Sequence, residues 1–396
     1  NGSLTKCSWN DAFQIIKEKL SQIPKNKISG FVGDMINMET TYIFKDLLSR
    51  IFKTENYESR LDHYYMNNNS RENYLFNSTI KGIEETDLII LIGVNPRLEA
   101  TIINSRIRKS FLNNDTKIFS TNDVGDLTYP YIIFDNNTDK IKDIFEDNDD
   151  LSYEIKKAKK PSVIFGESFF LLKSSIYLFE LAKTFLKKNN KITNEWNPLN
   201  LISRDASSVG SLDLGFYKNK NNQNEVLKNL QSNNYDLVYL LGVDSLNFNK
   251  KNEFIIYQGS HGDKGAEIAD VILPGAAYTE QDGFYTNLEG LLQKAYKASY
   301  PPGNAKEDWQ IINELSNYIS SKNLYNSKDS LEKHMINYLN LHNSKNNSSN
   351  NLEKNYIQEK ITIKNIDYFY SNAIARASKT MSECRKEKNN LNRRNV

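Results

Sequence analysis

The sequence repeats one pattern, a short apolar run that ends in glycine with a polar residue at most two positions later. The pattern occurs five times, and its polar members are Asp34, Asn95, Glu167, Asp244 and His261. Stretches with the apolar spacing of an amphipathic helix lie between these runs. Strands that alternate with helices predict parallel sheets covered on both faces. We therefore expect an α/β fold with two doubly wound parallel-sheet lobes.

The best-defined strands are unbroken apolar runs, which is typical of strands buried on both faces. These runs span 28–32, 87–92, 161–165 and 235–241, and residues 131–134 form a shorter one. In a doubly wound sheet, ligands bind beyond the carboxyl ends of the strands. The polar residues that follow the glycines are therefore expected to border a binding crevice.

The length of 396 residues exceeds what one hydrophobic core usually supports. We expect a first α/β lobe over residues 1–150 and a second over 151–325. Residues 326–396 are expected to form a helical and irregular C-terminal extension. Within it, the low-complexity segment 341–356 is expected to be a flexible link.

Composition limits the partners and the compartment. The 51 basic and 49 acidic residues nearly balance, which argues against a nucleic-acid partner. No apolar run reaches the roughly 18 residues of a membrane span. Ser8 and Asp11 form a capping box, so the amino-terminal region is expected to hold a helix rather than a signal or transit peptide.

The chain has two cysteines, Cys7 and Cys384. A four-iron cluster needs about four thiolates, and structural zinc needs about four ligands at close spacing. Two distant cysteines supply neither, and reduced thiols are favoured over a disulfide between the termini. No metal site is therefore expected.

The segment 257–290 concentrates glycine and polar residues. Gly259, Gly262 and Gly265 follow a strand, an arrangement that lets the backbone approach a ligand or another chain segment closely. His261 is either a proton carrier or a structural loop residue, and we favour the structural interpretation. Glu280, Asp282 and Glu289 are either an acid–base set or acceptors of backbone N–H bonds in turns, and we favour the second.

Residues 258–290 resemble the molybdopterin oxidoreductase family and, within it, the large iron–sulfur subunits of respiratory complex I. Further segments extend the resemblance in the same order along the chain: 71–77, 87–97, 104–110, 212–216, 301–309, 361–364 and 375–381. The resemblance implies the parallel-sheet lobes of the molybdopterin-oxidoreductase type.

The resemblance also implies a pterin nucleotide crevice, which we expect to be vestigial. Its expected positions are Gly93, Asn95, Gly242, Gly259, His261, Gly262, Asp263 and Gly265. Two departures support an empty crevice. No counterpart of the family's usual metal-binding side chain stands out, and Leu291 occupies a position where the family often has arginine. We expect this chain to bind no cofactor and to have no catalytic residues.

The implied function is that of a non-catalytic scaffold in the peripheral arm of the proton-pumping NADH:ubiquinone oxidoreductase. FMN and iron–sulfur clusters would belong to the wider complex. The family's cysteine-rich cluster domain has no counterpart in this sequence, and we expect it to be a separate chain, a cleaved piece or lost. Of these, we favour a separate cysteine-rich iron–sulfur chain among the partners. The residues expected to dock or to stabilise the structure are Arg71, Arg97, Arg106, Glu280 and Asn287.

The resemblance places the complex on the matrix side of the mitochondrial inner membrane. The abundance of Asn, Lys, Ile, Tyr and Phe is typical of an AT-rich genome, which suggests an organelle-encoded gene. Two alternatives stay open: a subunit of a molybdopterin-type redox enzyme, which predicts bound metal and pterin, and an α/β protein that binds a small ligand in the crevice.

Overall fold

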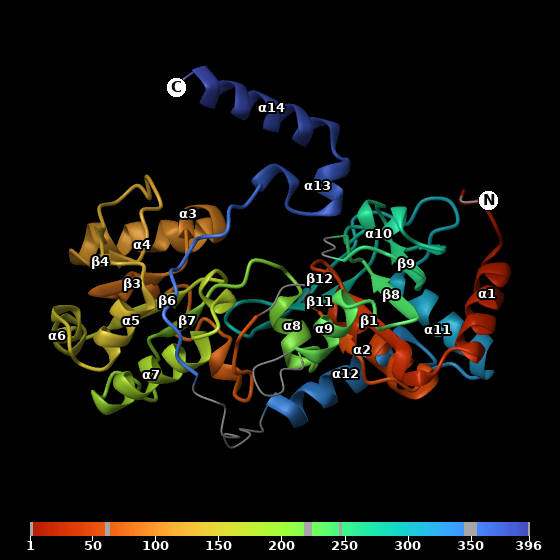
Figure 1. The fold of residues 1–396 in the computed structure, drawn as a ribbon, viewed down its shortest axis with the longest axis horizontal. Helices are drawn as coiled ribbons and strands as arrows, with labels where there is room; N and C mark the ends of the chain where they lie inside the picture. Colours follow the sequence, from red (N-terminus) through yellow and green to blue (C-terminus); the bar gives the residue numbers. More distant parts are fainter. Residues whose placement is uncertain (1–2, 60–63, 218–223, 245–247, 344–354, 395–396) are drawn as a thin grey trace.

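The computed structural model describes residues 3–59, 64–217, 224–244, 248–343 and 355–394 (Figure 1). Two parallel sheets of five strands each form two lobes within these ranges, accompanied by one antiparallel hairpin. Helices cover both faces of each sheet, and a helical and extended segment follows at the C-terminus. The predicted fold class is confirmed. None of the helices in the described part of the chain is long and apolar enough to cross a membrane.

Lobe A is built on a sheet with the strand order β10-β9-β8-β1-β2. The strands are β1 (Ile28–Val32), β2 (Tyr57–Glu58), β8 (Leu237–Leu241), β9 (Phe254–Gly259) and β10 (Val271–Pro274). One face packs on α1 (Trp9–Gln22), α2 (Met38–Asp46), α11 (Asp308–Ser320) and α12 (Lys328–Asn343). The other face packs on α9 (Glu225–Gln231) and α10 (Lys264–Glu267). The central strands β1 and β8 are therefore buried along their whole length.

Lobe B has the strand order β5-β4-β3-β6-β7. The strands are β3 (Leu88–Ile92), β4 (Lys117–Ser120), β5 (Ile132–Ile133), β6 (Pro161–Phe165) and β7 (Leu199–Leu201). One face packs on α5 (Thr138–Phe145), α6 (Asp150–Lys157) and α7 (Ser175–Lys188), and the other on α4 (Thr101–Asn114). Short elements complete the two lobes: η1 (Lys25–Lys27), η2 (Leu47–Phe52), η3 (Arg71–Asn73), η4 (Gly82–Glu85), α3 (Pro96–Glu99), η5 (Phe169–Leu171), α8 (Ser208–Asp213), β11 (Gly283–Thr286) and β12 (Leu292–Ala295).

The two sheets are interleaved along the chain. Strands β1 and β2 come before all of lobe B, yet β1 pairs with β8 over five residues in the middle of the lobe A sheet. A division at residue 150 therefore does not separate the sheets. Residues 147–149 lie between α5 and α6, and Asp150 begins α6, so the expected boundary falls inside lobe B. Most of the expected link at 341–356 lies outside the described residues.

The sequence patterns found the long buried strands and missed the short ones. The run at 131–134 is present as the two-residue strand β5, whereas β2, β4 and β7 were not predicted. The capping box is confirmed, since the Ser8 side chain accepts from the Asp11 backbone N–H and the Asp11 carboxylate accepts from the Ser8 N–H. The expected helix begins directly after it, at Trp9.

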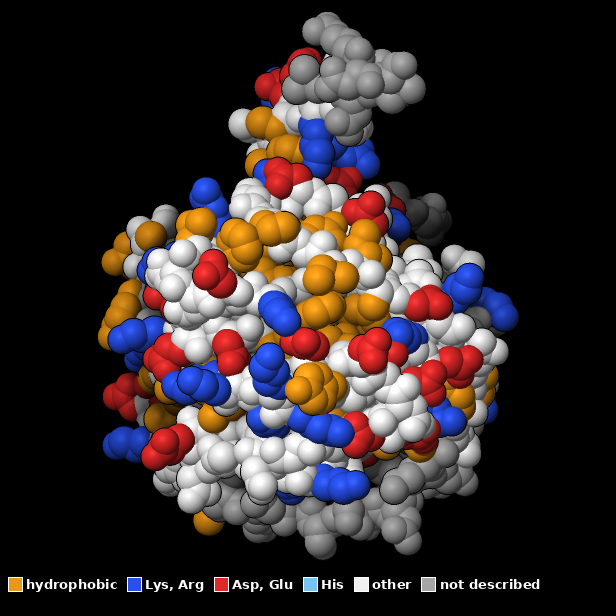
Figure 2. Space-filling model, turned by 90° about the vertical axis from the view of Figure 1, so that its left-hand side faces the viewer, with side chains coloured by type: hydrophobic (Ala, Val, Ile, Leu, Met, Phe, Trp, Pro, Cys, Tyr) orange, Lys and Arg blue, Asp and Glu red, His pale blue; other side chains and the backbone are white. Residues whose placement is uncertain are grey.

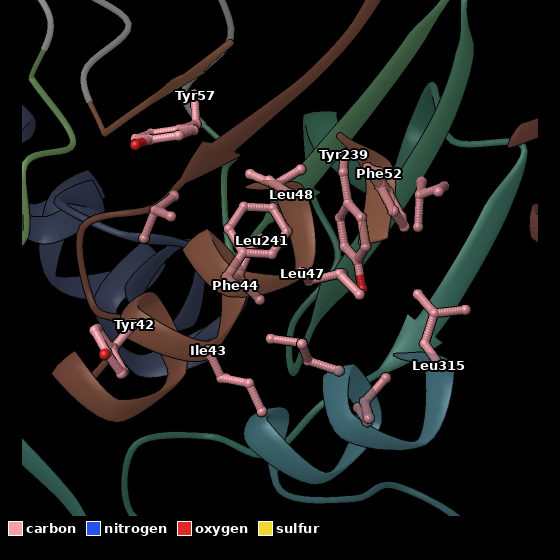
Figure 3. Close-up of a cluster of buried hydrophobic side chains, with 14 of the residues drawn as sticks. Tyr42, Ile43, Phe44, Leu47, Leu48, Phe52, Tyr57, Tyr239, Leu241 and Leu315 are labelled. Atoms are coloured by element: carbon pink, nitrogen blue, oxygen red, sulfur yellow. The ribbon is translucent and has the colours of Figure 1, made fainter. Parts of the chain in front are cut away.

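Aromatic and branched side chains fill the core of lobe A (Figure 3). Phe44 and Phe52, from α2 and η2, pack on Tyr239 of β8, and the rings of Phe44 and Tyr239 meet edge to face at 4.9 Å. The Tyr239 hydroxyl is buried and donates to Gln258 Oε1 at 2.6 Å. Its polar atom is therefore satisfied, as a buried hydroxyl requires.

Each sheet has a glycine pair where its strand order reverses. In lobe A the reversal lies between β1 and β8, and a Cβ atom at Gly33 would overlap the carbonyl oxygen of Gly242. In lobe B it lies between β3 and β6, and a Cβ atom at Gly166 would overlap the carbonyl oxygen of Gly93. Gly242 and Gly93 have φ values of +64° and +61°, which favour glycine. The recurring glycines therefore let two neighbouring strand ends approach closely.

We predict that Gly33→Ala lowers the free energy of unfolding by about 3 kcal/mol, because the added methyl group meets backbone that cannot move aside. Gly125→Ala is the control. Gly125 has a φ of +75° but open space around it, so its substitution introduces backbone strain of about 1 kcal/mol without a clash. Urea unfolding of both variants measures the difference. Equal losses would contradict a role for close packing at Gly33.

A buried carboxylate of α2 binds the backbone of the hairpin β11–β12. Glu39 of α2 is 1% exposed, and its Oε2 accepts from the Phe284 backbone N–H at 2.7 Å. Its Oε1 has no hydrogen-bond partner among the described residues. Burial raises the pKa of Glu39 from 4.5 to about 7, so the neutral acid is favoured in the folded chain.

We predict that Glu39 makes the fold less stable as the pH rises from about 5 to 7.5. The unfolded chain releases this proton near its ordinary pKa of 4.5, while the folded chain retains it up to about 7. This difference between the two pKa values lowers the free energy of unfolding by about 3 kcal/mol at pH 8, relative to pH 4. Urea unfolding across this range should show a steeper loss for the wild type than for Glu39→Gln. Parallel curves would contradict the prediction.

Candidate functional site

A cavity of about 480 Å³ lies between the two lobes, where carboxyl ends of strands from both sheets converge. On the lobe A side it is lined by the residues after β1 and β8, including Asp34 and Asp244. On the lobe B side it is lined by Glu99, at the end of α3, and by Arg204, after β7. This is the position in which doubly wound folds bind ligands.

The C-terminal segment, residues 355–377, runs along lobe B and continues towards lobe A (Figure 1), and we call it the strap. Several of its residues between Lys364 and Arg376 line the cavity. It is anchored on lobe B, where the Thr138 N–H donates to the Glu359 carbonyl at 2.9 Å and Ile361 is fully buried. Farther along, η6 (Tyr368–Tyr370) and α13 (Ala373–Ala377) contribute residues to the cavity lining. Arg376 then forms an ion pair with Asp263 of lobe A. The strap therefore joins the two lobes.

The cavity carries more negative than positive groups. Its carboxylates are Asp34, Glu99, Asp205, Asp244, Asp308 and Asp367, and its fixed cations are Arg204, Lys364 and Arg376. Two of these cations are held by carboxylates that do not line the cavity, since Arg204 pairs with buried Glu167 at 2.7 Å and Arg376 with Asp263. Carboxylates thus outnumber cations in the lining, although Arg385, outside it, pairs with Asp367, and the whole chain has a net charge of +2.

Burial shifts the acids of the cavity towards their neutral forms. It raises the pKa of Glu99 to about 7, although the Asn95 backbone N–H donates to Glu99 Oε1 at 2.8 Å. Burial also raises the pKa of Asp244, which accepts from the Tyr257 hydroxyl at 3.0 Å and the Gly265 N–H at 3.3 Å. These acids favour a positively charged neighbour, because a cation stabilises their ionised forms.

The structure brings some of the expected crevice residues together. Gly242, Gly259 and His261 line the cavity. His261 Nδ1 lies 3.0 Å from Ser260 Oγ, and the His261 carbonyl accepts from the Tyr257 hydroxyl, which fits the structural interpretation.

The other expected crevice residues lie away from the cavity lining. Gly93 packs beneath Ile361 of the strap, Asn95 caps α3 and Asp263 binds the strap. Gly265 packs against Tyr257, and Gly262 lies beside Ala266. Sequence reasoning missed Glu99 and Arg204 because neither belongs to a glycine loop.

The carboxylates of the segment 257–290 accept backbone N–H bonds, as the turn interpretation predicts. Glu280 accepts from Ala277 at 2.9 Å, Asp282 from Lys297 at 2.8 Å and Glu289 from Ile80 at 2.6 Å. Asn287 Oδ1 accepts from the N–H groups of Glu289 and Leu291 and closes the hairpin turn. These side chains fix local backbone geometry.

Arg71 connects three separate parts of the chain. Its guanidinium donates to both carboxylate oxygens of Asp213, at 2.9 and 2.8 Å, and to the Gly290 carbonyl at 2.8 Å. Tyr74 donates to the same carboxylate at 2.8 Å. The Asp213 side chain is 1% exposed, so its charge depends on these donors.

Arg97 and Arg106 form ion pairs at the surface of lobe B. Arg97 contacts Asp126 at 2.6 Å, and Arg106 contacts Glu84, which also accepts from Lys109 at 2.9 Å. Their guanidinium groups are thus bound within the chain, and their role in docking stays a prediction.

The comparisons with known proteins agree with this architecture. The model of the molybdopterin oxidoreductase family matches residues 1–318, which include both sheets. The chain belongs to the molybdopterin oxidoreductase family. Among solved structures, the formyltransferase/hydrolase complex FhcABCD from Methylorubrum extorquens, in complex with methylofuran, has a TM-score of 0.58 at 11% identity. That similarity covers 80% of this chain and 97% of the other, and it supports the fold alone.

This molybdopterin oxidoreductase family member also has closer relatives. The NADH-ubiquinone oxidoreductase 75 kDa subunit of Reclinomonas americana is 35% identical over 407 residues, which cover 97% of this chain and 59% of that protein. An NADH-quinone oxidoreductase subunit of Rickettsia typhi is 36% identical over 392 residues, 97% of this chain and 56% of that protein. The chain thus spans less than two thirds of the length of both relatives.

The residues of the crevice do not fit the pterin nucleotide that the family name implies. A nucleotide brings phosphate anions, which need an excess of donors and cations. The cavity instead presents six carboxylates against three cations, and carboxylates outside the lining already hold Arg204 and Arg376. No group of three or more potential metal ligands occurs among the described residues.

We predict that Arg71→Ala lowers the free energy of unfolding by about 3 kcal/mol, because it leaves the buried Asp213 charge without its main partner. Arg97→Ala is the matched control. It also breaks an arginine–aspartate pair, but both side chains are well exposed, so a loss below about 1 kcal/mol is expected. Urea unfolding measures both. Similar losses of unfolding free energy would show that burial does not determine how much the Arg71–Asp213 ion pair stabilises the fold.

Proposed function

We propose that this chain is a non-catalytic scaffold subunit in the peripheral arm of a proton-pumping NADH:quinone oxidoreductase, respiratory complex I. The observation that carries the proposal is the similarity, along 97% of the chain, to two relatives named as subunits of NADH oxidoreductases. The crevice, which is rich in carboxylates and lined in part by the strap, supports a role without the family's pterin cofactor. The resemblance at residues 71–77 and 97–110 is to the complex I subunit in particular and supports the same function.

The physical role would be burial and support of electron carriers held by a neighbour. We propose that a separate cysteine-rich chain holds iron–sulfur clusters against this subunit, and that FMN belongs to another part of the complex. A large apolar shell limits solvent access to clusters and so tunes their potentials. The proposed location is the matrix side of the mitochondrial inner membrane, with the subunit encoded in the organelle.

The far end of lobe B is a suitable docking face. Figure 2 shows apolar side chains gathered on this side of the molecule. Ile102 of α4 is 67% exposed, and both residues of β5, Ile132 and Ile133, are more than half exposed. Strand β5 is also an edge of its sheet. An exposed apolar edge strand is usually covered by a partner.

Native purification from gently solubilised membranes tests the proposal. We predict that the chain co-migrates with flavin and iron–sulfur proteins in a very large assembly, accompanied by a short cysteine-rich chain. Ile102→Asp with Ile133→Asp should weaken this association by about tenfold or more, because it places charges in an apolar interface. Tyr300→Asp, at an even more exposed position after β12 in lobe A, is the control.

Two results would contradict the proposal. Migration of the wild-type chain alone, or with one small partner, would rule out a scaffold role in a large complex. If the double isoleucine variant assembles like the wild type, the chain is still a subunit of a large complex, but its docking face lies elsewhere. Thermal melting of the purified variants separates lost docking from lost folding.

A further inference from the structure

In the described part of the chain, the hairpin β11–β12 forms a sheet of two strands, so each of them is an edge. At other sheet edges the chain supplies its own cover. Phe76 forms an antiparallel bridge with Asn200 of β7, and Lys306 forms a parallel bridge with Gly275, which directly follows β10. An edge strand without such cover presents unpaired N–H and C=O groups to which a further strand can bind.

The outer edge of β12 carries four backbone groups that have no hydrogen bond to the described chain. Opposed residues of an antiparallel pair alternate between bonded and non-bonded positions. At the turn, the Asn287 N–H donates to the Leu291 carbonyl at 3.0 Å, so the bonded positions of β12 lie at every second residue after Leu291. The N–H and C=O groups of Leu292 and Lys294 consequently point away from β11. Phe284, opposite Lys294, likewise directs its N–H away from β12, to a carboxylate of α2 at 2.7 Å.

The side chains along this edge are mostly exposed and uncharged. Leu291 is 55% exposed and Leu292 is 37% exposed. The other residues of β12 are exposed as well, except for Lys294, which is half-buried. Lys294 already pairs with Glu332 of α12 at 3.1 Å. The edge therefore offers backbone hydrogen bonds and an apolar contact, but no unpaired charge that would attract an anionic lipid or a nucleic acid.

The backbone groups of the edge define what can cover it. N–H and C=O groups at a spacing of two residues match another extended backbone, which presents complementary groups at the same spacing. A helix bonds its own backbone groups internally and cannot pair in this way. Beside the two leucines, a partner strand needs apolar side chains. Opposite Lys294 it needs a neutral or acidic one, because like charges across a strand pair are destabilising.

We infer that the outer edge of β12 binds an extended segment of a neighbouring subunit as a third strand. The segment has apolar side chains beside Leu291 and Leu292, and no Lys or Arg opposite Lys294. This inference rests on the proposed function, since the neighbour belongs to the complex, and it adds a second contact to the docking face on lobe B. The backbone bonds at Leu292 and Lys294 supply affinity, while the side chains beside them set the register.

Hydrogen–deuterium exchange, resolved to single residues by mass spectrometry, tests the inference on the wild-type chain, alone and within the assembly. In the isolated chain, the outward amides of Leu292 and Lys294 should exchange rapidly. The amides of Gln293 and Ala295 bond to β11 and should exchange about tenfold or more slower. Within the assembly, the two outward amides should slow by about tenfold or more, because they then bond to the partner strand.

A pair of substitutions at one position separates the backbone bond from the side chain. Lys294→Pro removes an outward N–H and places a ring in the path of the partner strand, so it should weaken association with the assembly by about tenfold. Lys294→Gln also loses the ion pair with Glu332 but keeps the N–H, and it should assemble like the wild type. Thermal melting of both variants checks their fold. If the proline variant does not fold, the exchange of the wild-type amides still decides.

The outcomes distinguish this inference from the proposed function. A wild-type chain that migrates alone contradicts the proposed function and this inference with it. A chain that assembles while its Leu292 and Lys294 amides still exchange rapidly contradicts the inference alone, as does equal assembly of the two Lys294 variants. Slow exchange of both amides in the isolated chain would also overturn it, because the chain itself or a second copy would then cover the edge.

Discussion

The close contact between neighbouring strand ends is the constraint on which the rest of this structure depends. In each sheet, a glycine that follows one central strand presses against the carbonyl of a glycine that follows its neighbour, Gly33 on Gly242 and Gly166 on Gly93. Backbone bonds hold the same junctions, since Gly33 donates to the Leu241 carbonyl and Gly166 to the Ile92 carbonyl. The strand ends are therefore held side by side. In lobe A, the residues that follow them line the cavity between the lobes.

Three ties hold the lobes around the cavity. Arg71 joins Asp213 to the hairpin turn at Gly290, the strap runs from lobe B to Asp263, and α8 contributes residues to the cavity wall. The tie at Arg71 uses charged and backbone groups, whereas the strap and α8 also place Ile361 and Leu212 in the apolar core of lobe B. The apolar cores stay within the lobes, where unbroken strands are covered on both faces. The cavity can thus be polar without weakening either core.

The sequence predicted the strands whose residues are all buried. Unbroken apolar runs located β1, β3, β6 and β8, and the glycines after them located the carboxyl ends of the sheets. The short strand β4 begins with an exposed lysine and has no such run, so its pattern could not be separated from a loop. The interleaved order of the lobes was also hidden, because pairing of β1 with β8 leaves no local signal. Glu99 and Ser211 line the cavity from the helices α3 and α8, and nothing in the neighbouring sequence predicts this position.

The insertion of lobe B within lobe A has a consequence for the order of folding during synthesis. The segment from β3 to β7 forms a complete parallel sheet, so it can fold as soon as residues 88–201 have emerged. Strand β1 must wait for its central partner β8, more than 200 residues later in the chain. Until then its apolar face is exposed to the cellular environment. The strap, which comes last, can seal the interior only after both lobes exist, so a truncated nascent chain would carry an open cavity and an unfinished sheet.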